Sequence, residues 1–365
     1  MYLKNLNLIN FRNYENQYIK FHKGINVLIG NNGHGKTNVL EAIYLMAIGK
    51  SFRTKKDKEL ISFDKKESYI ASNIDFGSRL GKIEIKLGGV QKKAIKVDGF
   101  SLEKLGELLG NLKVVIFSPE DLKLIKEGPK ERRAFLDREI SQLRPKYYSL
   151  LVNYNQVLAQ RNNLIKSFNP DLNLLDVYDV QLSELGANIF KYRKEFSKKL
   201  ANIAREIHGS ITSSRECLQV EYKTNIIPKD SDNINIAESF LNLLKLARKD
   251  DIERRQTLYG IHRDDLDVYL NDLDVKSFGS QGQQRSASIS LKLSEIQLIY
   301  EDSNEYPILL LDDIFSELDQ GRQRLLIDKF KDIQVFITTA EKSHLDTLEG
   351  LEKRIFNVEK GTIRE

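Results

Sequence analysis

The sequence of 365 residues predicts an α/β fold that is assembled from both ends of the chain and interrupted by a helical insertion. Three observations carry this prediction. A β-branched strand leads into a glycine-rich loop at residue 30, the hydrophobic period becomes helical after Pro129, and strands and helices alternate again after about residue 257. We therefore expect residues 1–118 and 257–365 to form one α/β domain and residues 119–256 to form an inserted helical domain.

The N-terminal segment is dominated by strand patterns and contains no proline before Pro119. Alternating apolar and polar residues predict strands at 2–9 and 17–21, and the apolar run Ile25–Ile29 predicts a buried strand. Further alternating runs between residues 67 and 98 are separated by glycines, which indicates an antiparallel meander. Val114–Phe117 indicates another buried strand.

The middle of the chain carries the period of amphipathic helices. Apolar residues recur at three-to-four spacing over 147–165 and over 182–207, with turn residues at 167–171 between them. These two helices should pack as an antiparallel pair, and a further helical stretch is expected at 237–255.

The C-terminal segment returns to alternating strands and helices. We expect strands at 267–270, 308–311 and 335–338, and helices at 283–300 and 316–331.

Composition limits the class of protein without identifying it. A mean hydropathy of -0.42 and the lack of a run of about 20 apolar residues predict no transmembrane helix and no membrane partner. No signal peptide is visible, and the single cysteine, Cys217, fits a cytoplasmic protein. The net charge of +5 permits nucleic-acid binding but does not argue for it.

A phosphate-binding loop directly follows the strand Ile25–Ile29. The residues match G-x-x-x-x-G-K-[ST] in full and precede an amphipathic helix, in the order Gly30, Asn31, Asn32, Gly33, His34, Gly35, Lys36, Thr37. Inward-pointing backbone N–H groups and the helix N-terminus would bind the phosphates of a nucleotide. Lys36 would reach the β- and γ-phosphates, and the Thr37 hydroxyl would coordinate Mg²⁺.

Two carboxylates end the apolar run at 308–311. A buried parallel strand would deliver Asp312 to the sheet edge beside the phosphates, where it would hold Mg²⁺. Asp313, on the opposite pleat, would polarise an attacking water. The alternative is that an aspartate here only caps a helix.

A serine-glycine element opens the helix expected at 283–300. Ser280 is a good N-cap, and Gly282 and Gln283 leave backbone donors exposed at that N-terminus, which predicts a second anion site. An ordinary capped helix explains Ser280 but not the concentration of glycine and glutamine.

The order of these motifs resembles that of ABC-type ATPases, with the segment 316–319 similar to their D-loop. The resemblance is closer to the RecF family of bacterial recombination mediators, which are short relatives of the SMC-type ATPases. It rests on the short insertion and on motifs along the whole chain, at residues 10–14, 30–33, 50–53, 117–121, 132–137, 262–265 and 279–285.

The resemblance implies a P-loop ABC-type ATPase head with ATP and Mg²⁺ as cofactors. Each ATP would lie between the phosphate loop of one subunit and Ser280 and Gly282 of a second copy, near Arg12 and Tyr14. Lys36, Asp313 and Ser280 would then be the catalytic residues. The resemblance further implies an ATP-dependent homodimer on single-stranded, gapped or duplex DNA, working with RecO and RecR to promote RecA loading.

Two departures from the ABC pattern predict slow hydrolysis. No histidine directly follows the strand at 335–338, since Thr339 and Ala340 stand there and His344 is the nearest histidine. Ser118 and Pro119 stand where a Q-loop glutamine would follow Val114–Phe117. We expect an ATPase that acts as a conformational timer.

Two questions stay open at this stage. The basic residues of the insertion, among them Arg132, Arg133, Arg161 and Arg193, would suit DNA phosphates, but glutamates interspersed among them equally suit a solvated helix face. Lysines near residues 55 and 92 are rival contacts. The alternative functions are an ABC transporter subunit and an ATP-binding module with negligible hydrolysis.

Overall fold

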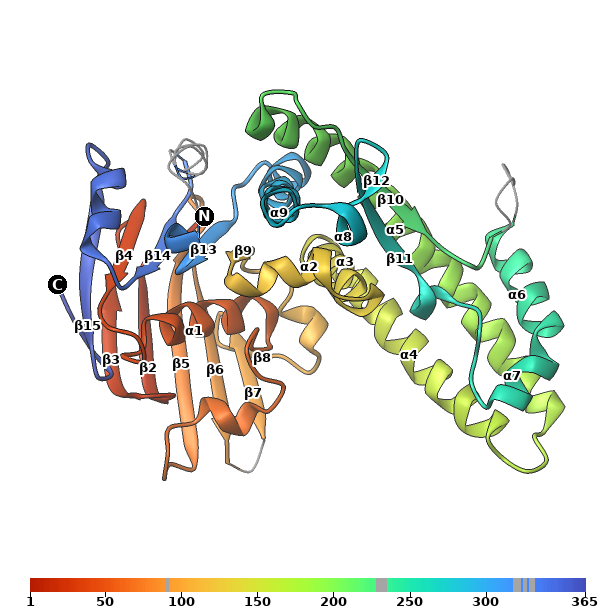
Figure 1. Ribbon diagram of the computed structural model, residues 1–365. Helices are drawn as coiled ribbons and strands as arrows, with labels where there is room; N and C mark the ends of the chain where they lie inside the picture. Colours follow the sequence, from red (N-terminus) through yellow and green to blue (C-terminus); the bar gives the residue numbers. More distant parts are fainter. Residues whose placement is uncertain (90–91, 228–234, 318–322, 324–326, 328–331) are drawn as a thin grey trace. The chain divides into compact units, whose positions relative to one another are not determined.

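The protein folds into two compact units in a computed structural model, one formed by Met1–Asp121 with Glu295–Glu365 and the other by Leu122–Ser294 (Figure 1). The structure describes residues 1–89, 92–227, 235–317, 323, 327 and 332–365. The first unit thus contains both chain ends, as the sequence predicts. Residues 257–294, which we expected to belong to the α/β domain, cluster with the helical unit.

An antiparallel sheet forms one layer of the first unit, with the strand order β3-β2-β5-β6-β7-β8 and β1 paired to β5. Its register is regular, since Ile70 lies opposite Leu8 on one side and Ile85 on the other. Strands β5, β6 and β7 of this sheet form the meander that was predicted between residues 67 and 98, and the N-terminal strands β2 and β3 extend it. The strands are β1 (Tyr2–Leu3), β2 (Asn5–Phe11), β3 (Tyr14–Lys20), β5 (Glu67–Asp75), β6 (Leu80–Gly88), β7 (Lys93–Val97) and β8 (Phe100–Ser101).

A mostly parallel sheet forms the second layer, with the order β16-β15-β4-β14-β13-β9. Strands β4, β13, β14 and β9 are parallel and buried, which is why they appear in the sequence as continuous apolar runs. The strands are β4 (Ile25–Ile29), β9 (Val114–Phe117), β13 (Ile308–Asp312), β14 (Val335–Thr339), β15 (Lys353–Glu359) and β16 (Thr362–Arg364).

Helix α1 (Lys36–Ile48) packs between the two sheets of the first unit. Its residues Val39 to Ala47 are almost all buried, in one core with Leu8 and Ile85 of the antiparallel sheet and Leu310 and Phe336 of the parallel sheet. The helix is therefore apolar on all sides rather than amphipathic, and its start is fixed beside the carboxyl end of β4.

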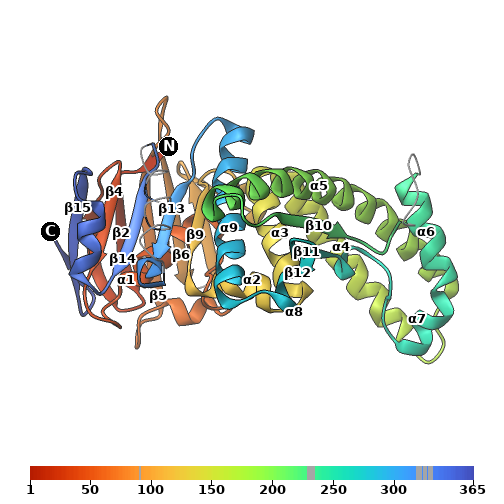
Figure 2. The same cartoon turned by 45° about the horizontal axis from the view of Figure 1, so that its top comes forward.

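The second unit is built around two long antiparallel helices (Figure 2). Helix α5 has 41 residues, and its first turn is capped by Asp171, whose side chain accepts hydrogen bonds from the N–H groups of Asn173 and Leu174. The helices wholly in this unit are α2 (Lys123–Lys126), α3 (Pro129–Leu143), α4 (Pro145–Ile165), α5 (Leu172–Thr212), α6 (Ile236–Leu246), α7 (Arg248–Arg254) and α8 (Val275–Phe278).

A small antiparallel sheet explains why residues 257–294 join the helical unit. Strand β11 (Asp265–Leu270) pairs along its whole length with β10 (Leu218–Lys223) and also with β12 (Leu273–Asp274). The sequence predicted β11 but not its partner β10. Helix α9 (Gln281–Ser303) begins in this unit, while the helix expected at 316–331 lies largely outside the described residues.

Candidate nucleotide-binding site

The phosphate-binding loop has the strand–loop–helix geometry that its motif requires. It leaves β4 at Gly30, where a β-carbon would come within 2.2 Å of the carbonyl oxygen of Val358 on the neighbouring strand β15. It enters α1 through Gly35, whose φ of 116° suits glycine. Asn31, Asn32 and Gly33 are exposed between these two points. The loop is thus fixed at both ends and open to a ligand in the middle.

The Lys36 side chain folds back over the loop. Its Nζ donates hydrogen bonds to the carbonyl oxygens of Gly30, at 2.7 Å, and of Asn31, at 3.1 Å. Burial lowers the pKa of Lys36, while the negative charges of Asp313 and Asp312 act in the opposite direction. The lysine is therefore held inside the loop, where a bound phosphate would offer stronger acceptors than two carbonyls.

Thr37 and Asp312 lie in direct contact, although they are far apart in the sequence. The Thr37 hydroxyl donates to Oδ1 of Asp312 at 2.7 Å, and the Thr338 hydroxyl lies 2.9 Å from the same oxygen. A carboxylate and hydroxyls beside a phosphate loop form the oxygen-rich donor set that Mg²⁺ prefers when it keeps most of its ligands from water and phosphate. The residues present therefore fit the metal that the sequence predicts.

Asp313 occupies a left-handed backbone conformation directly after β13. Its φ is 53°, and its N–H donates to the Thr338 hydroxyl at 3.0 Å. Burial raises the pKa of the Asp313 carboxyl and the charge of Lys36 lowers it. A carboxylate whose pKa is raised is a better proton acceptor, so this geometry suits the general base that the sequence predicts.

His344 lies in the same region and was not predicted as a site residue. Its Nδ1 is 2.8 Å from the Thr339 hydroxyl at the end of β14, and its charge acts on the pKa of Asp313. In the sequence, the only signal for His344 was that it is the histidine nearest to the strand at 335–338, at some distance from the position where ABC ATPases place a histidine. The segment η6 (Lys342–Leu348) brings the ring back toward the strand end.

Arg12 and Tyr14 lie against the phosphate loop and α1. The Tyr14 hydroxyl donates to the carbonyl of Gly35 at 3.0 Å. Arg12 donates through Nε and a terminal nitrogen to the carboxylate of Glu41, at 2.8 and 2.7 Å. Glu41 is fully buried in α1 and also accepts from Ser51. Glu41 was not predicted as a site residue, although a single acidic residue among the apolar residues of α1 indicates a buried polar contact.

The predicted signature residues Ser280, Gly282 and Gln283 lie in the second unit, at the start of α9. Ser280 and Gly282 are exposed. The Ser280 hydroxyl accepts from the N–H of Gln283 at 3.3 Å, and the side-chain oxygen of Gln283 accepts from the N–H of Ser280 at 2.9 Å. This reciprocal pair is a capping box, so the predicted N-cap is present. The D-loop-like segment 316–319 extends outside the described residues.

Several of the basic residues considered for DNA contact are instead buried inside the second unit and paired with carboxylates. Arg161 is fully buried and bonded to Asp179 and Asp251, both of which are fully buried as well. Arg193 is buried against Asp137 and Asp264. The exposed cations of this unit include Lys191, Lys194 and Lys198 of α5, for which DNA contact and a solvated helix face both stay open.

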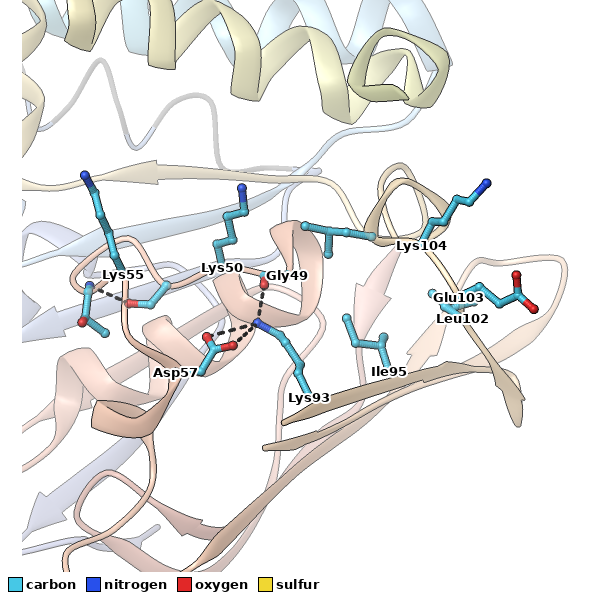
Figure 3. A pocket seen from close by; sticks show the side chains of 12 residues that line it. Gly49, Lys50, Lys55, Asp57, Lys93, Ile95, Leu102, Glu103 and Lys104 are labelled. Carbon is cyan, nitrogen blue, oxygen red and sulfur yellow. Dashed lines mark hydrogen bonds and ion pairs between the residues drawn. The ribbon is translucent and has the colours of Figure 1, made fainter. Parts of the chain in front are cut away.

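A hollow of about 640 Å³ lies at the opposite end of α1 from the phosphate loop. In Figure 3, Lys93 reaches Asp57 and the carbonyl of Gly49, the C-cap of α1. Lys50, Lys55 and Lys104 add to its basic lining, and Ile95, Leu102 and Leu105 supply its apolar part. Since α1 has 13 residues, about 20 Å separates this hollow from the phosphate loop.

The described residues contain no cluster of three or more histidine, cysteine or acidic side chains able to hold a metal ion. Among the helices that the structure describes, none has the length and apolar content needed to cross a bilayer.

The fold and the site together define the class of protein. A phosphate loop after β4, a carboxylate at the end of β13 on the same parallel sheet, and an antiparallel sheet packed on α1 form an ABC-type ATPase head. The RecF/RecN/SMC N terminal domain family matches residues 2–364. The chain belongs to the RecF family, within the superfamily of SMC-type and ABC-type ATPases.

Relatives and solved structures support this assignment along the whole chain. The DNA replication and repair protein RecF of Clostridioides difficile is 50% identical over 100% of this chain and 98% of its own length. That of Alkaliphilus oremlandii is 48% identical over the full length of both.

A structure of the recombination mediator protein RecF with ATP, from the RecFOR pathway, is 37% identical. Its TM-score is 0.91, and the match covers 100% of this chain and 97% of that one. The Smc head domain of Pyrococcus furiosus, at 16% identity and a TM-score of 0.56, shares the fold.

Proposed function

We propose that this protein is an ATP-dependent, DNA-binding recombination mediator whose nucleotide state controls the pairing of two copies. The observation that carries the proposal is the contact of Thr37 with Asp312 beside Lys36, in a chain that belongs to the RecF family. These are the groups that a P-loop ATPase uses to hold ATP and its metal.

In this proposal each predicted residue has a role in the nucleotide site. The loop from Gly30 to Thr37 binds the phosphates, and Thr37 and Asp312 would hold Mg²⁺, which would neutralise phosphate charge. Asp313 orients and deprotonates the attacking water. Arg12 and Tyr14 support the loop near the adenosine, with Arg12 acting mainly through its ion pair to Glu41.

The second half of the ATP site comes from a second copy of the chain. Ser280 and Gly282 are exposed at the N-terminus of α9, a helix of 23 residues, where the positive end of the helix dipole favours an anion. In this proposal, the anion is the γ-phosphate bound by the partner. ATP therefore holds the homodimer together, and hydrolysis releases it.

DNA and protein partners follow from the family to which the chain belongs. We propose that the ATP-bound dimer binds DNA at single-strand gaps or single-strand/duplex junctions in the cytoplasm. It works there with RecO and RecR to promote RecA loading. The exposed lysines of α5 and those around the hollow at Gly49 are the candidate phosphate contacts.

Hydrolysis should be slow and stimulated by DNA. Ser118 stands in the Q-loop position, and its N–H is occupied by the Asp121 carboxylate at 2.7 Å. His344 approaches the site from an offset position and through Thr339. An ATPase with such an arrangement serves as a switch rather than as a motor, and we propose that it times release from DNA.

Binding to gapped DNA tests the proposal. Fluorescence anisotropy would be recorded with ATP, with ADP and without nucleotide, for the wild type and for Lys36→Ala. We expect tight binding by the wild type with ATP alone, affinity that falls steeply with salt, and no response of Lys36→Ala to nucleotide. Phosphate release would be followed in the same samples.

Two results would separate the alternatives. DNA binding that ignores nucleotide would contradict the proposed switch. ATP-dependent DNA binding with turnover that DNA leaves at the background rate would favour an ATP-binding module with negligible hydrolysis.

A further inference from the structure

A chain of hydrogen bonds connects the signature serine to the interior of the second unit. Gln283, whose oxygen accepts from the N–H of Ser280, turns its amide nitrogen to Glu216 and donates to Oε1 at 2.9 Å. Gln283 therefore makes two different contacts with its two side-chain atoms. Its amide plane is fixed only while both partners are present.

Glu216 uses its other oxygen to contact a buried histidine. Oε2 of Glu216 lies 3.1 Å from Nε2 of His208, which has no exposed surface. Nδ1 of the same ring lies 3.0 Å from the Ser290 hydroxyl on α9. Both ring nitrogens thus have partners, which orients the imidazole and, through it, the carboxylate.

Helix α9 holds one end of this series of hydrogen bonds, at Ser290. Ser286, Ser290 and Ser294 are buried, and each donates its hydroxyl proton to the carbonyl four residues earlier, at 2.6 to 2.9 Å. With its proton used in this way, the Ser290 oxygen can accept from Nδ1 of His208. The Glu216 carboxylate then accepts from Nε2 when the ring carries both protons, as an imidazolium. The four-residue spacing therefore places three buried serine oxygens along one face of α9, where they can accept hydrogen bonds.

The chain of bonds joins three segments that are distant in the sequence. His208 is in the last two turns of α5, Glu216 is in the connection from α5 to β10, and Gln283 is in the first turn of α9. Helix α5 has 41 residues and is therefore about 60 Å long. A displacement at its C-terminal end would be transmitted to Ser280 through two side chains.

We infer that Glu216 and His208 are positioning residues for Ser280 and that they couple the C-terminal end of α5 to the signature loop. The inference rests on the proposed function, in which Ser280 completes the ATP site of a second copy. Neither residue touches nucleotide. Their effect is to hold Gln283, and hence the backbone N–H and hydroxyl of Ser280, in the capping-box geometry.

Substitution of Glu216 tests this inference. Glu216→Ala removes the acceptor, Glu216→Gln keeps an oxygen for the Gln283 amide, and Glu221→Ala is the matched control at an exposed glutamate of β10. Each variant would be compared with the wild type in binding of a fluorescent ATP analogue by the isolated monomer, in ATP-dependent dimerisation, and in hydrogen exchange of residues 203–212 and 280–285.

We expect Glu216→Ala to bind the analogue normally, because the phosphate loop is unchanged, but to weaken dimerisation about tenfold, as the loss of a hydrogen bond to a charged group does. Amides at 280–285 should exchange faster, and ATP should no longer alter exchange at 203–212. Glu221→Ala should behave like the wild type, and Glu216→Gln, whose single oxygen cannot accept from both Gln283 and His208, should show a smaller loss than Glu216→Ala. Normal dimerisation and unchanged exchange at 280–285 in Glu216→Ala would overturn the inference.

Failure of the proposed function would give a different pattern. A wild type that stays monomeric with ATP contradicts the ATP-dependent dimer. Hydrogen exchange at 280–285 in Glu216→Ala would still decide whether Glu216 holds the signature loop, since that measurement needs no nucleotide.

Discussion

At the scale of single residues, two adjacent aspartates have different surroundings. Asp312 contacts Thr37 and Thr338, whereas Asp313 has left-handed backbone geometry and a raised pKa. The left-handed φ of Asp313 shows that the chain leaves the regular strand conformation directly after Asp312. Titratable groups whose surroundings push their pKa values apart are a common way to divide acid and base roles in a site.

Asp313→Asn should abolish turnover while leaving ATP binding intact. The amide cannot accept the proton from water, so we expect phosphate release to fall by about a hundredfold or more. ATP-dependent dimerisation should persist and become longer-lived. Phosphate release and analogue binding measured on the same preparation check this, and unchanged turnover would remove Asp313 from the mechanism.

His262 should make the second unit sensitive to mild acid. Its Nε2 donates to the Thr257 carbonyl and its Nδ1 accepts from Tyr154, so the neutral ring is satisfied. Burial lowers its pKa from 6.5 to about 4. Between these values only the unfolded chain takes up the proton, so stability is lost as the pH falls, by about 2 kcal/mol from pH 6.5 to 5.

Urea unfolding at pH 7 and pH 5 measures this effect. The wild type should lose more stability over that interval than His262→Asn, which has no titrating ring. Equal losses in the two proteins would show that His262 does not carry the pH dependence.

At the scale of elements, the sequence predicted the strands and helices that surround the phosphate loop most accurately. Ile25–Ile29 and Val114–Phe117 were predicted with their observed bounds because a buried parallel strand is apolar throughout. Strand β10 was missed although Leu218, Val220 and Tyr222 alternate with polar residues, so its sequence did carry a strand signal. Its pairing with β11 is a long-range contact that the sequence pattern does not give. The same pairing brings residues 257–294 into the helical unit.

The sequence predicted the local geometry of the candidate site where motifs determine it, and it missed the contacts that tertiary structure determines. Lys36 and Thr37 follow from their motif, and Ser280 follows from capping chemistry. The contacts of Arg12 with Glu41, of His344 with Thr339 and of Glu216 with Gln283 join segments that no spacing rule connects. The pattern of charges along the sequence also could not predict that Arg161 and Arg193 are buried, because the carboxylates that pair with them come from other elements of the fold.

Gly30→Ala should disrupt nucleotide binding through the backbone of β15. The new methyl group would meet the Val358 carbonyl at 2.2 Å, so β4 or β15 must shift and displace the loop. A displacement of the order of 1 Å at a positioned site typically costs a hundredfold. Binding of an ATP analogue checks this, with Gly128→Ala as control, because a methyl group there meets nothing within 4 Å. Equal affinity in both variants would contradict the close approach.

Arg161→Met should strongly destabilise the second unit. The arginine joins α4 to Asp179 of α5 and Asp251 of α7, and its removal leaves two buried carboxylates without their shared cation. We expect a loss of about 3–5 kcal/mol in the free energy of unfolding. Urea unfolding at pH 7 measures it, and Arg205→Met, at an exposed arginine of α5, should change stability by less than about 0.5 kcal/mol. A similar small change for Arg161→Met would show that the network contributes little.

At the scale of the whole molecule, the two halves of the proposed ATP site lie in different units of the chain. The phosphate loop belongs to Met1–Asp121 with Glu295–Glu365, and Ser280 belongs to Leu122–Ser294. Pairing of two copies would give each ATP both halves. In that arrangement, nucleotide state controls association, and DNA affinity follows from a paired surface more than from a net charge of +5.

Complementation between two inactive variants tests this central claim most directly. Lys36→Ala keeps Ser280 but lacks a working phosphate loop, and Ser280→Arg keeps the loop but blocks the signature position. Sedimentation velocity with ATP should show monomers for each variant alone. An equimolar mixture should form heterodimers, because the loop of one chain and the serine of the other make one complete site. ATP-induced dimers of Ser280→Arg alone, or a mixture that stays monomeric while the wild type dimerises, would contradict the claim that the site is shared between two copies.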